Sequence, residues 1–127
     1  MKHGAGSKLA VALLAVLALG GCSGDSSLSV AATSVPRFES VIIDVRTPEE
    51  YRVGHLDGAL LIDIKDASFD AKIAELDPDA DYVVYCRSGN RSAQAVLRMR
   101  EIGIRNITDL GSLENASAET GIAIIEG

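Results

Sequence analysis

The 127-residue chain contains no tryptophan, and aromatic residues make up 4 % of it, although 47 % of its residues are hydrophobic. A core with so few aromatic rings has to be filled by Val, Ile, Leu and Ala, which are the side chains that a parallel sheet covered on both faces prefers. The length leaves room for one domain of ordinary size. These features predict a single α/β domain.

Cysteine and histidine are also scarce, because the chain has two of each. Two cysteines, Cys22 and Cys86, cannot build a disulfide framework. Outside residues 1–21, His55 is the one histidine, and one histidine with one thiol cannot supply the ligands of a zinc site. We therefore expect no metal and no other cofactor.

Basic residues are outnumbered, with 12 Lys and Arg against 18 Asp and Glu. Without residues 1–21, which carry two lysines, 10 basic and 18 acidic side chains remain, and the net charge becomes about −8. Such a surface argues against nucleic acid or an anionic membrane surface as a partner. Internal repeats and nucleotide-binding glycine patterns are absent from the sequence.

The single long apolar run is residues 9–19, which follows Lys2 and Lys8 and is too short to span a bilayer. It ends in Leu19-Gly20-Gly21-Cys22, which resembles the lipobox of bacterial lipoproteins. That resemblance implies a signal peptide over residues 1–21, cut before Cys22, and a lipid such as palmitate on Cys22. The alternatives are an ordinary secretory signal with an incidental cysteine, or an uncleaved anchor.

Positions 22–36 are mostly Ser, Ala, Gly and Thr with few large apolar residues, which predicts a flexible tether to a domain over residues 37–127. The protein is then expected to be extracytoplasmic, held by lipid on the cell membrane or outer membrane. If Cys22 is lipidated, Cys86 has no internal partner, and an unpaired thiol in that compartment is a candidate reactive group.

Cys86 lies between a predicted strand, residues 81–85, and a predicted helix, residues 92–100. Unpaired N–H groups at the helix start, together with Arg87 and Arg91, favour an anion and bias the thiol toward thiolate. Cys86 could instead be a small buried hydrophobic residue. Two arginines beside it argue against a purely structural role, because guanidinium groups are rarely buried without an anion.

Cys86-Arg87-Ser88-Gly89-Asn90-Arg91-Ser92 resembles the active-site loop of single-domain rhodaneses, which carry sulfur as a cysteine persulfide. Two upstream segments, residues 44–51 and 54–59, are similar to the other two rhodanese signatures and occur in the same order. The resemblance covers about residues 41–122. It implies a three-layer α/β/α domain with a central parallel sheet of four to five strands, Cys86 as the catalytic residue, and a donor-binding loop made of Arg87, Ser88, Gly89, Asn90, Arg91 and Ser92.

Residues 41–45 are predicted to form a central strand, after which Thr47 caps a helix that begins at Pro48. Asp44 and Arg46, at the end of that strand, are interpreted as structural residues near the site, with Arg46 expected to pair with Glu49 or Glu50. His55 is interpreted as a residue that fixes its loop, because a thiol of low pKa needs no separate base.

The remaining elements are predicted from the same signals: a strand at 60–63, a helix at 67–76 ended by a turn at 77–80, a helix end at Gly103 and a strand at 104–110. The chain departs from the rhodanese pattern at three positions. Asp57 stands where proline is usual, Ser112 replaces a usual glycine, and Ala116 or a neighbour stands where tryptophan is common.

Three functions are compatible with these residues. The first is a sulfurtransferase, expected to be monomeric, that moves sulfur from a small anionic donor such as thiosulfate to a thiol or cyanide acceptor. The second is a cysteine phosphatase or arsenate reductase, but their loops resemble Cys, five residues, Arg, whereas four residues separate Cys86 from Arg91. The third is a non-catalytic rhodanese-like binding or redox-sensing module, whose usual mark is loss of the loop cysteine.

Overall fold

The structure is a computed structural model that describes residues 38–127. These residues form one compact unit, Phe38–Gly127. The predicted signal peptide (residues 1–21), the lipidated Cys22 and the tether (residues 22–36) lie outside the described residues. Within the described unit, no helix has the length and apolar character needed to cross a membrane.

Four parallel strands form the central sheet, in the spatial order β3-β1-β4-β5. The predicted α/β class and its parallel sheet are confirmed, with four strands. All four predicted strands exist, with shifted ends. The observed bounds are Val41–Asp44 for β1, Leu60–Leu61 for β3, Asp81–Cys86 for β4 and Asn106–Ser112 for β5.

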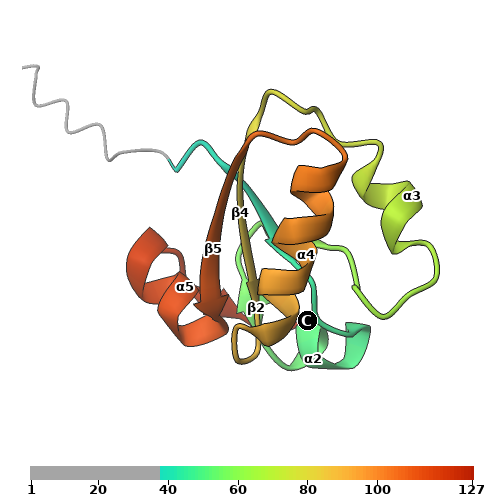
Figure 1. Cartoon of the computed structure of the whole chain (residues 1–127). Coiled ribbons are helices and arrows are strands. Elements are labelled where there is room, and N and C mark those ends of the chain that lie inside the picture. The colour runs from blue at the N-terminus through green and yellow to red at the C-terminus, as the bar shows by residue number, and fades with distance from the viewer. Residues whose placement is uncertain (1–37) are drawn as a thin grey trace, which may run out of the picture. The chain divides into compact units, whose positions relative to one another are not determined.

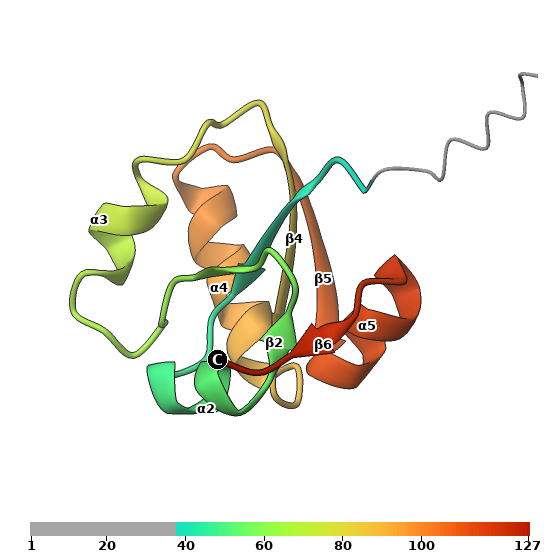
Figure 2. The same ribbon diagram turned by 180° about the vertical axis from the view of Figure 1, so that it is seen from behind.

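Helices cover both faces of the sheet, as the three-layer prediction requires. In the two opposite views of Figures 1 and 2, α3 (Phe69–Ile73) and α4 (Asn90–Glu101) lie on one side of the sheet and α5 (Leu113–Thr120) lies on the other. Tyr51 of the short helix α2 (Pro48–Val53) packs against the core on the α5 side.

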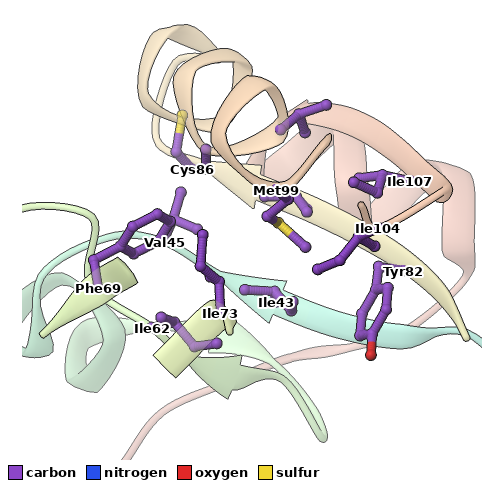
Figure 3. Packing of buried hydrophobic residues seen from close by; sticks show 13 residues of the cluster. Ile43, Val45, Ile62, Phe69, Ile73, Tyr82, Cys86, Met99, Ile104 and Ile107 are labelled. Atoms are coloured by element: carbon purple, nitrogen blue, oxygen red, sulfur yellow. The ribbon is translucent and has the colours of Figure 1, made fainter. Parts of the chain in front are cut away.

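The two faces of the sheet have separate cores because successive strand residues point to opposite sides. In β1, Ile43 joins the cluster under α3 and α4, whereas Ile42 joins the cluster under α5. Figure 3 shows the first cluster, in which Phe69 and Met99 pack against the sheet. Cys86 belongs to this cluster, so the end of β4 that carries it is anchored in the core.

Several elements differ from the sequence prediction. The helix predicted at 67–76 is reduced to the five residues of α3, and α4 begins at Asn90 rather than Ser92. Beyond α4, Gly103 makes a turn at φ 99°, and β5 begins two residues later than predicted. Three further elements were not predicted: α5, and the strands β2 (His55–Leu56) and β6 (Ile124–Ile125), which form an antiparallel pair.

The start of α2 follows the prediction. Thr47 is the N-cap, Pro48 begins the helix, and Thr47 and Glu50 form a reciprocal capping box. Because the side chains of Thr47 and Glu50 each accept from the other's backbone N–H, two N–H groups that the helix leaves unpaired are satisfied.

Asp44 and Arg46 form a buried pair where β1 meets α2. The Asp44 carboxylate accepts hydrogen bonds from the Arg46 backbone N–H at 2.9 Å and from its guanidinium, the shortest of which is 2.6 Å from Nη2. Arg46 Nη2 also donates to the Gly54 carbonyl oxygen at 2.6 Å. The predicted pairing of Arg46 with Glu49 or Glu50 is therefore wrong, because its side chain turns back to the fully buried Asp44.

Removing the Asp44 carboxylate should strongly destabilise the domain. Asp44→Ala leaves the Arg46 guanidinium buried without its counter-charge, so the free energy of unfolding should fall by about 3–5 kcal/mol, measured by urea denaturation. Asp44→Asn should lose less, because its side-chain oxygen still accepts from the Arg46 N–H. Asp57→Ala, which removes an exposed carboxylate, is the control and should change little; equal losses in Asp44→Ala and Asp57→Ala would refute the structural role of Asp44.

Candidate active site

Cys86 lies at the carboxyl end of the central strand β4, where the chain turns into α4. The turn is made by Gly89, which is the N-cap of α4 and has a left-handed backbone with φ 101°. That conformation is rarely open to residues with a side chain. The turn directs the backbone N–H groups that precede α4 toward the sulfur of Cys86.

The Cys86 sulfur makes hydrogen bonds with two residues of its loop, Gly89 and Ser92. The Gly89 N–H donates to Sγ at 2.9 Å, and Oγ of Ser92 lies 3.5 Å from Sγ. Burial is the largest single influence on the thiol and acts to raise its pKa. Hydrogen bonds from the Ser92 side chain and from the N–H groups of Ser92, Gly89 and Ser88 together outweigh it, so the pKa of Cys86 is lowered.

Ser92 has two possible partners for its one hydroxyl proton. Its Oγ lies 3.1 Å from the Gly89 carbonyl oxygen as well as near Sγ. A hydroxyl donates one hydrogen bond at a time. The proton is therefore available to a thiolate and can return to the carbonyl oxygen when the sulfur is neutral.

The two loop arginines are in different environments. Arg91 makes a two-pronged ion pair with Glu50 of α2, with N–O distances of 2.7 and 2.8 Å. Arg87 is exposed and has no ion-pair partner within residues 38–127. Of the predicted donor-binding residues, Arg87, Ser88 and Asn90 face solvent, whereas Ser92 is buried beside the sulfur.

His55 is held against α2. Its ring stacks on Tyr51 with the centroids 3.6 Å apart, and its Nδ1 lies 2.8 Å from the Tyr51 carbonyl oxygen. The next residue, Leu56, donates its backbone N–H to the Tyr85 hydroxyl at 3.0 Å. These are contacts of a residue that fixes its loop.

A pocket of about 430 Å³ adjoins the loop, with Arg87, the residue after Cys86, in its wall. Val53, Leu113 and Ile124 give it apolar sides, and Glu50 and Glu114 add carboxylates. It is large enough for a small organic molecule. No group of three or more potential metal ligands is found in the part of the chain that the structure describes.

The positions that depart from the rhodanese pattern have local structural roles. Ser112 is the N-cap of α5 and accepts a hydrogen bond from the Asn115 N–H at 3.1 Å. Ala116 is fully buried on the same helix. Asp57 is exposed, and its backbone N–H donates to the Ala123 carbonyl oxygen.

Sequence reasoning did not identify Glu50 as part of the site. Its position three residues after Thr47 fits a capping box, in which the Glu50 carboxylate accepts a hydrogen bond from the Thr47 backbone N–H. Its partner Arg91 lies 41 residues further along the chain, and no local pattern indicates that contact.

The structure is thus a parallel α/β domain in which a glycine turn and a helix start hold a cysteine of lowered pKa, and this places it in the class of α/β domains built around a cysteine loop. Comparison with known families narrows this class, because the sequence model of the rhodanese-like domain matches residues 31–119. The chain belongs to the rhodanese-like domain family.

Sulfurtransferases are among its relatives. The chain is 34 % identical over 73 residues to the thiosulfate sulfurtransferase PspE of Escherichia coli (strain K12). The aligned residues cover 58 % of this chain and 70 % of that protein. It is 32 % identical over 85 residues to a sulfurtransferase of Allochromatium vinosum, covering 67 % of this chain and 78 % of that protein.

Solved structures agree on the fold. A rhodanese with anions from E. coli superimposes with a TM-score of 0.58 at 30 % identity, over 69 % of this chain and 99 % of that chain. The predicted rhodanese-like fold is thus confirmed.

Gly89→Ala should disturb the sulfur directly. Forcing an alanine to φ 101° should cost about 1–2 kcal/mol and displace the N–H that donates to Sγ, so the pKa of Cys86 should rise and its alkylation by iodoacetamide at neutral pH should slow. The measurements are thermal melting and the pH dependence of alkylation.

Gly103→Ala is the matched control, because Gly103 has a similar φ of 99° in the turn after the other end of α4. It should lower stability by a similar amount and leave the alkylation of Cys86 unchanged. If both variants slow alkylation equally, the loop hydrogen bond does not set the reactivity of the thiol.

Proposed function

We propose that the protein is a sulfurtransferase that moves sulfane sulfur from thiosulfate or a similar donor to a thiophilic acceptor through a persulfide on Cys86. The observation that carries the proposal is the set of donors around the Cys86 sulfur, led by the Gly89 N–H at 2.9 Å. The lowered pKa of Cys86 supports it, and so does the similarity to thiosulfate sulfurtransferase PspE.

In the first half-reaction, the Cys86 thiolate attacks the outer sulfur of thiosulfate. The S–S bond of the donor breaks, its electron pair leaves with sulfite, and a Cys86 persulfide forms. Arg87, which has no ion-pair partner among the described residues, supplies a positive charge that attracts the anionic donor. Arg91 supplies a second positive charge, which is partly balanced by Glu50. The N–H groups of the loop stabilise the persulfide anion.

In the second half-reaction, cyanide or a thiolate attacks the outer sulfur of the persulfide. The S–S bond breaks, its electrons return to the Cys86 sulfur, and the thiolate is regenerated for another cycle. The hydrogen-bond donors that favour the thiolate before the reaction also make it a good leaving group at this step. Neither half-reaction requires a metal or an organic cofactor.

The loop favours sulfur over phosphoryl chemistry. Four residues separate Cys86 from Arg91, which makes a smaller cradle than the five-residue spacing of cysteine phosphatase loops. The Arg91 guanidinium is moreover engaged by Glu50 through both terminal nitrogens, so it is not free to act as the phosphate-binding arginine of a phosphatase loop.

Persulfide formation is the decisive readout. After incubation with thiosulfate and removal of the excess, the intact mass of the folded protein should increase by one sulfur atom, and cyanide should remove it as thiocyanate. Cys86→Ser should show neither change and should melt close to the parent protein, because serine is nearly isosteric. If the parent protein gains no sulfur, the non-catalytic binding or redox-sensing function is favoured; sulfur gained by Cys86→Ser rules out the mechanism.

We also propose that the protein is extracytoplasmic and anchored through a lipid on Cys22. The support is the apolar run 9–19, which ends in the lipobox-like Leu19-Gly20-Gly21-Cys22. Cys22→Ser should release a folded domain from the membrane fraction of expressing bacteria, measured by fractionation and immunoblotting. Retention of the variant in that fraction contradicts the lipid anchor and favours an uncleaved helix.

A further inference from the structure

The ion pair between Glu50 and Arg91 joins α2 to the first turn of α4. Its two hydrogen bonds run from Nη1 to Oε2 and from Nη2 to Oε1, the parallel geometry in which arginine and carboxylate bind most strongly. The two side chains are 19 % and 26 % exposed, so water screens the pair only in part. Arg91 is therefore not a free cation of the loop.

Glu50 is itself held from the other side. Its Oε2 accepts hydrogen bonds from the backbone N–H and the hydroxyl of Thr47, each at 3.1 Å. The hydrogen bonds from Arg91 lower the pKa of Glu50 to about 2, so the carboxylate is charged throughout the neutral range. Moving the carboxylate away from Arg91 would also disturb its hydrogen bonds to Thr47.

The ionisable groups that interact with Arg91 are Glu50, the Cys86 thiol and Asp63, which follows β3. Glu50 is the strongest of them, since both of its carboxylate oxygens are bonded to the guanidinium. Arg87, on the same loop, is without an ion-pair partner in the described residues. One loop arginine is thus compensated and the other is not.

We propose that Glu50 is a positioning residue that restrains Arg91 and limits the positive charge acting on the sulfur and on bound anions. This proposal rests on the sulfurtransferase function, in which the site must release sulfite and discharge the persulfide as well as bind thiosulfate. Binding the donor and the product anion more tightly lowers KM without raising kcat. The Glu50–Arg91 pair accordingly favours turnover over tight anion binding.

Glu50→Gln tests this role, because glutamine can keep the capping box through its one carbonyl oxygen, while it removes the charge and replaces the second acceptor of Arg91 with an amide donor. Freed from its partner, Arg91 should lower the pKa of Cys86 further, measured from the pH dependence of iodoacetamide alkylation. In steady-state thiosulfate-to-cyanide transfer, KM for thiosulfate should fall about three- to fivefold, the scale of a partly exposed ion pair. The kcat should not rise, and sulfite should inhibit at lower concentration.

Glu49→Gln is the matched control. Glu49 is the exposed neighbour of Glu50 on the same helical turn and makes no ion pair within residues 38–127. The Glu49→Gln variant loses the same charge as Glu50→Gln, but it should change the pKa of Cys86 and the KM for thiosulfate much less than Glu50→Gln does. Equal effects of the two variants would show that only the net charge of α2 matters and would overturn the proposal.

The double variant tests whether Glu50 acts through Arg91. In an Arg91→Gln background, Glu50→Gln should no longer change the pKa of Cys86 or KM. If Glu50→Gln has an effect of the same size in that background, the proposal is contradicted. A higher KM in Glu50→Gln alone also contradicts it, because that result would mean that Glu50 orients Arg91 to bind the donor. Alkylation needs no sulfur transfer, so it decides the role of Glu50 even if the parent protein forms no persulfide.

Discussion

The hydrogen bond from the Gly89 N–H to the Cys86 sulfur is the contact on which the site depends. It requires a left-handed turn, which Gly89 supplies at φ 101°, and a strand end fixed in the core, which the burial of Cys86 supplies. It also requires a helix that begins at once, so that Ser92 reaches the same sulfur. The parallel sheet brings these three features together at one place, because β4 ends where α4 begins.

Three guanidiniums close to the loop differ in how their charge is balanced. Arg46 is buried with Asp44 and stabilises the fold, Arg91 shares its charge with Glu50, and Arg87 has no ion-pair partner among residues 38–127. A site with three free arginines would hold anions tightly and release them slowly. Under the proposed function, this arrangement leaves Arg87 as the uncompensated charge for a donor, while Arg46 and Arg91 hold α2 through Gly54 and Glu50.

Local features were predictable from the sequence and contacts between distant segments were not. The strand, turn and helix around Cys86 follow from neighbouring residues, since hydrophobic pattern and glycine act over a few positions. The partner of Arg46 was predicted wrongly. Its closeness in sequence to Glu49 and Glu50 suggested a pair with one of them, but the Arg46 side chain turns back to the buried Asp44. Glu50 and Arg91, and the strands β2 and β6, meet only through the fold.

Stabilisation of a sulfur anion on Cys86 by the loop is tested most directly by the ionisation of that thiol in the folded protein. Ultraviolet absorbance of the thiolate, titrated against pH with Cys86→Ser as the blank, measures it without any substrate. We expect the midpoint of this titration to lie below the value of about 8.5 for a free cysteine. A midpoint at or above that value would mean that burial outweighs the loop donors and that the loop does not stabilise the thiolate.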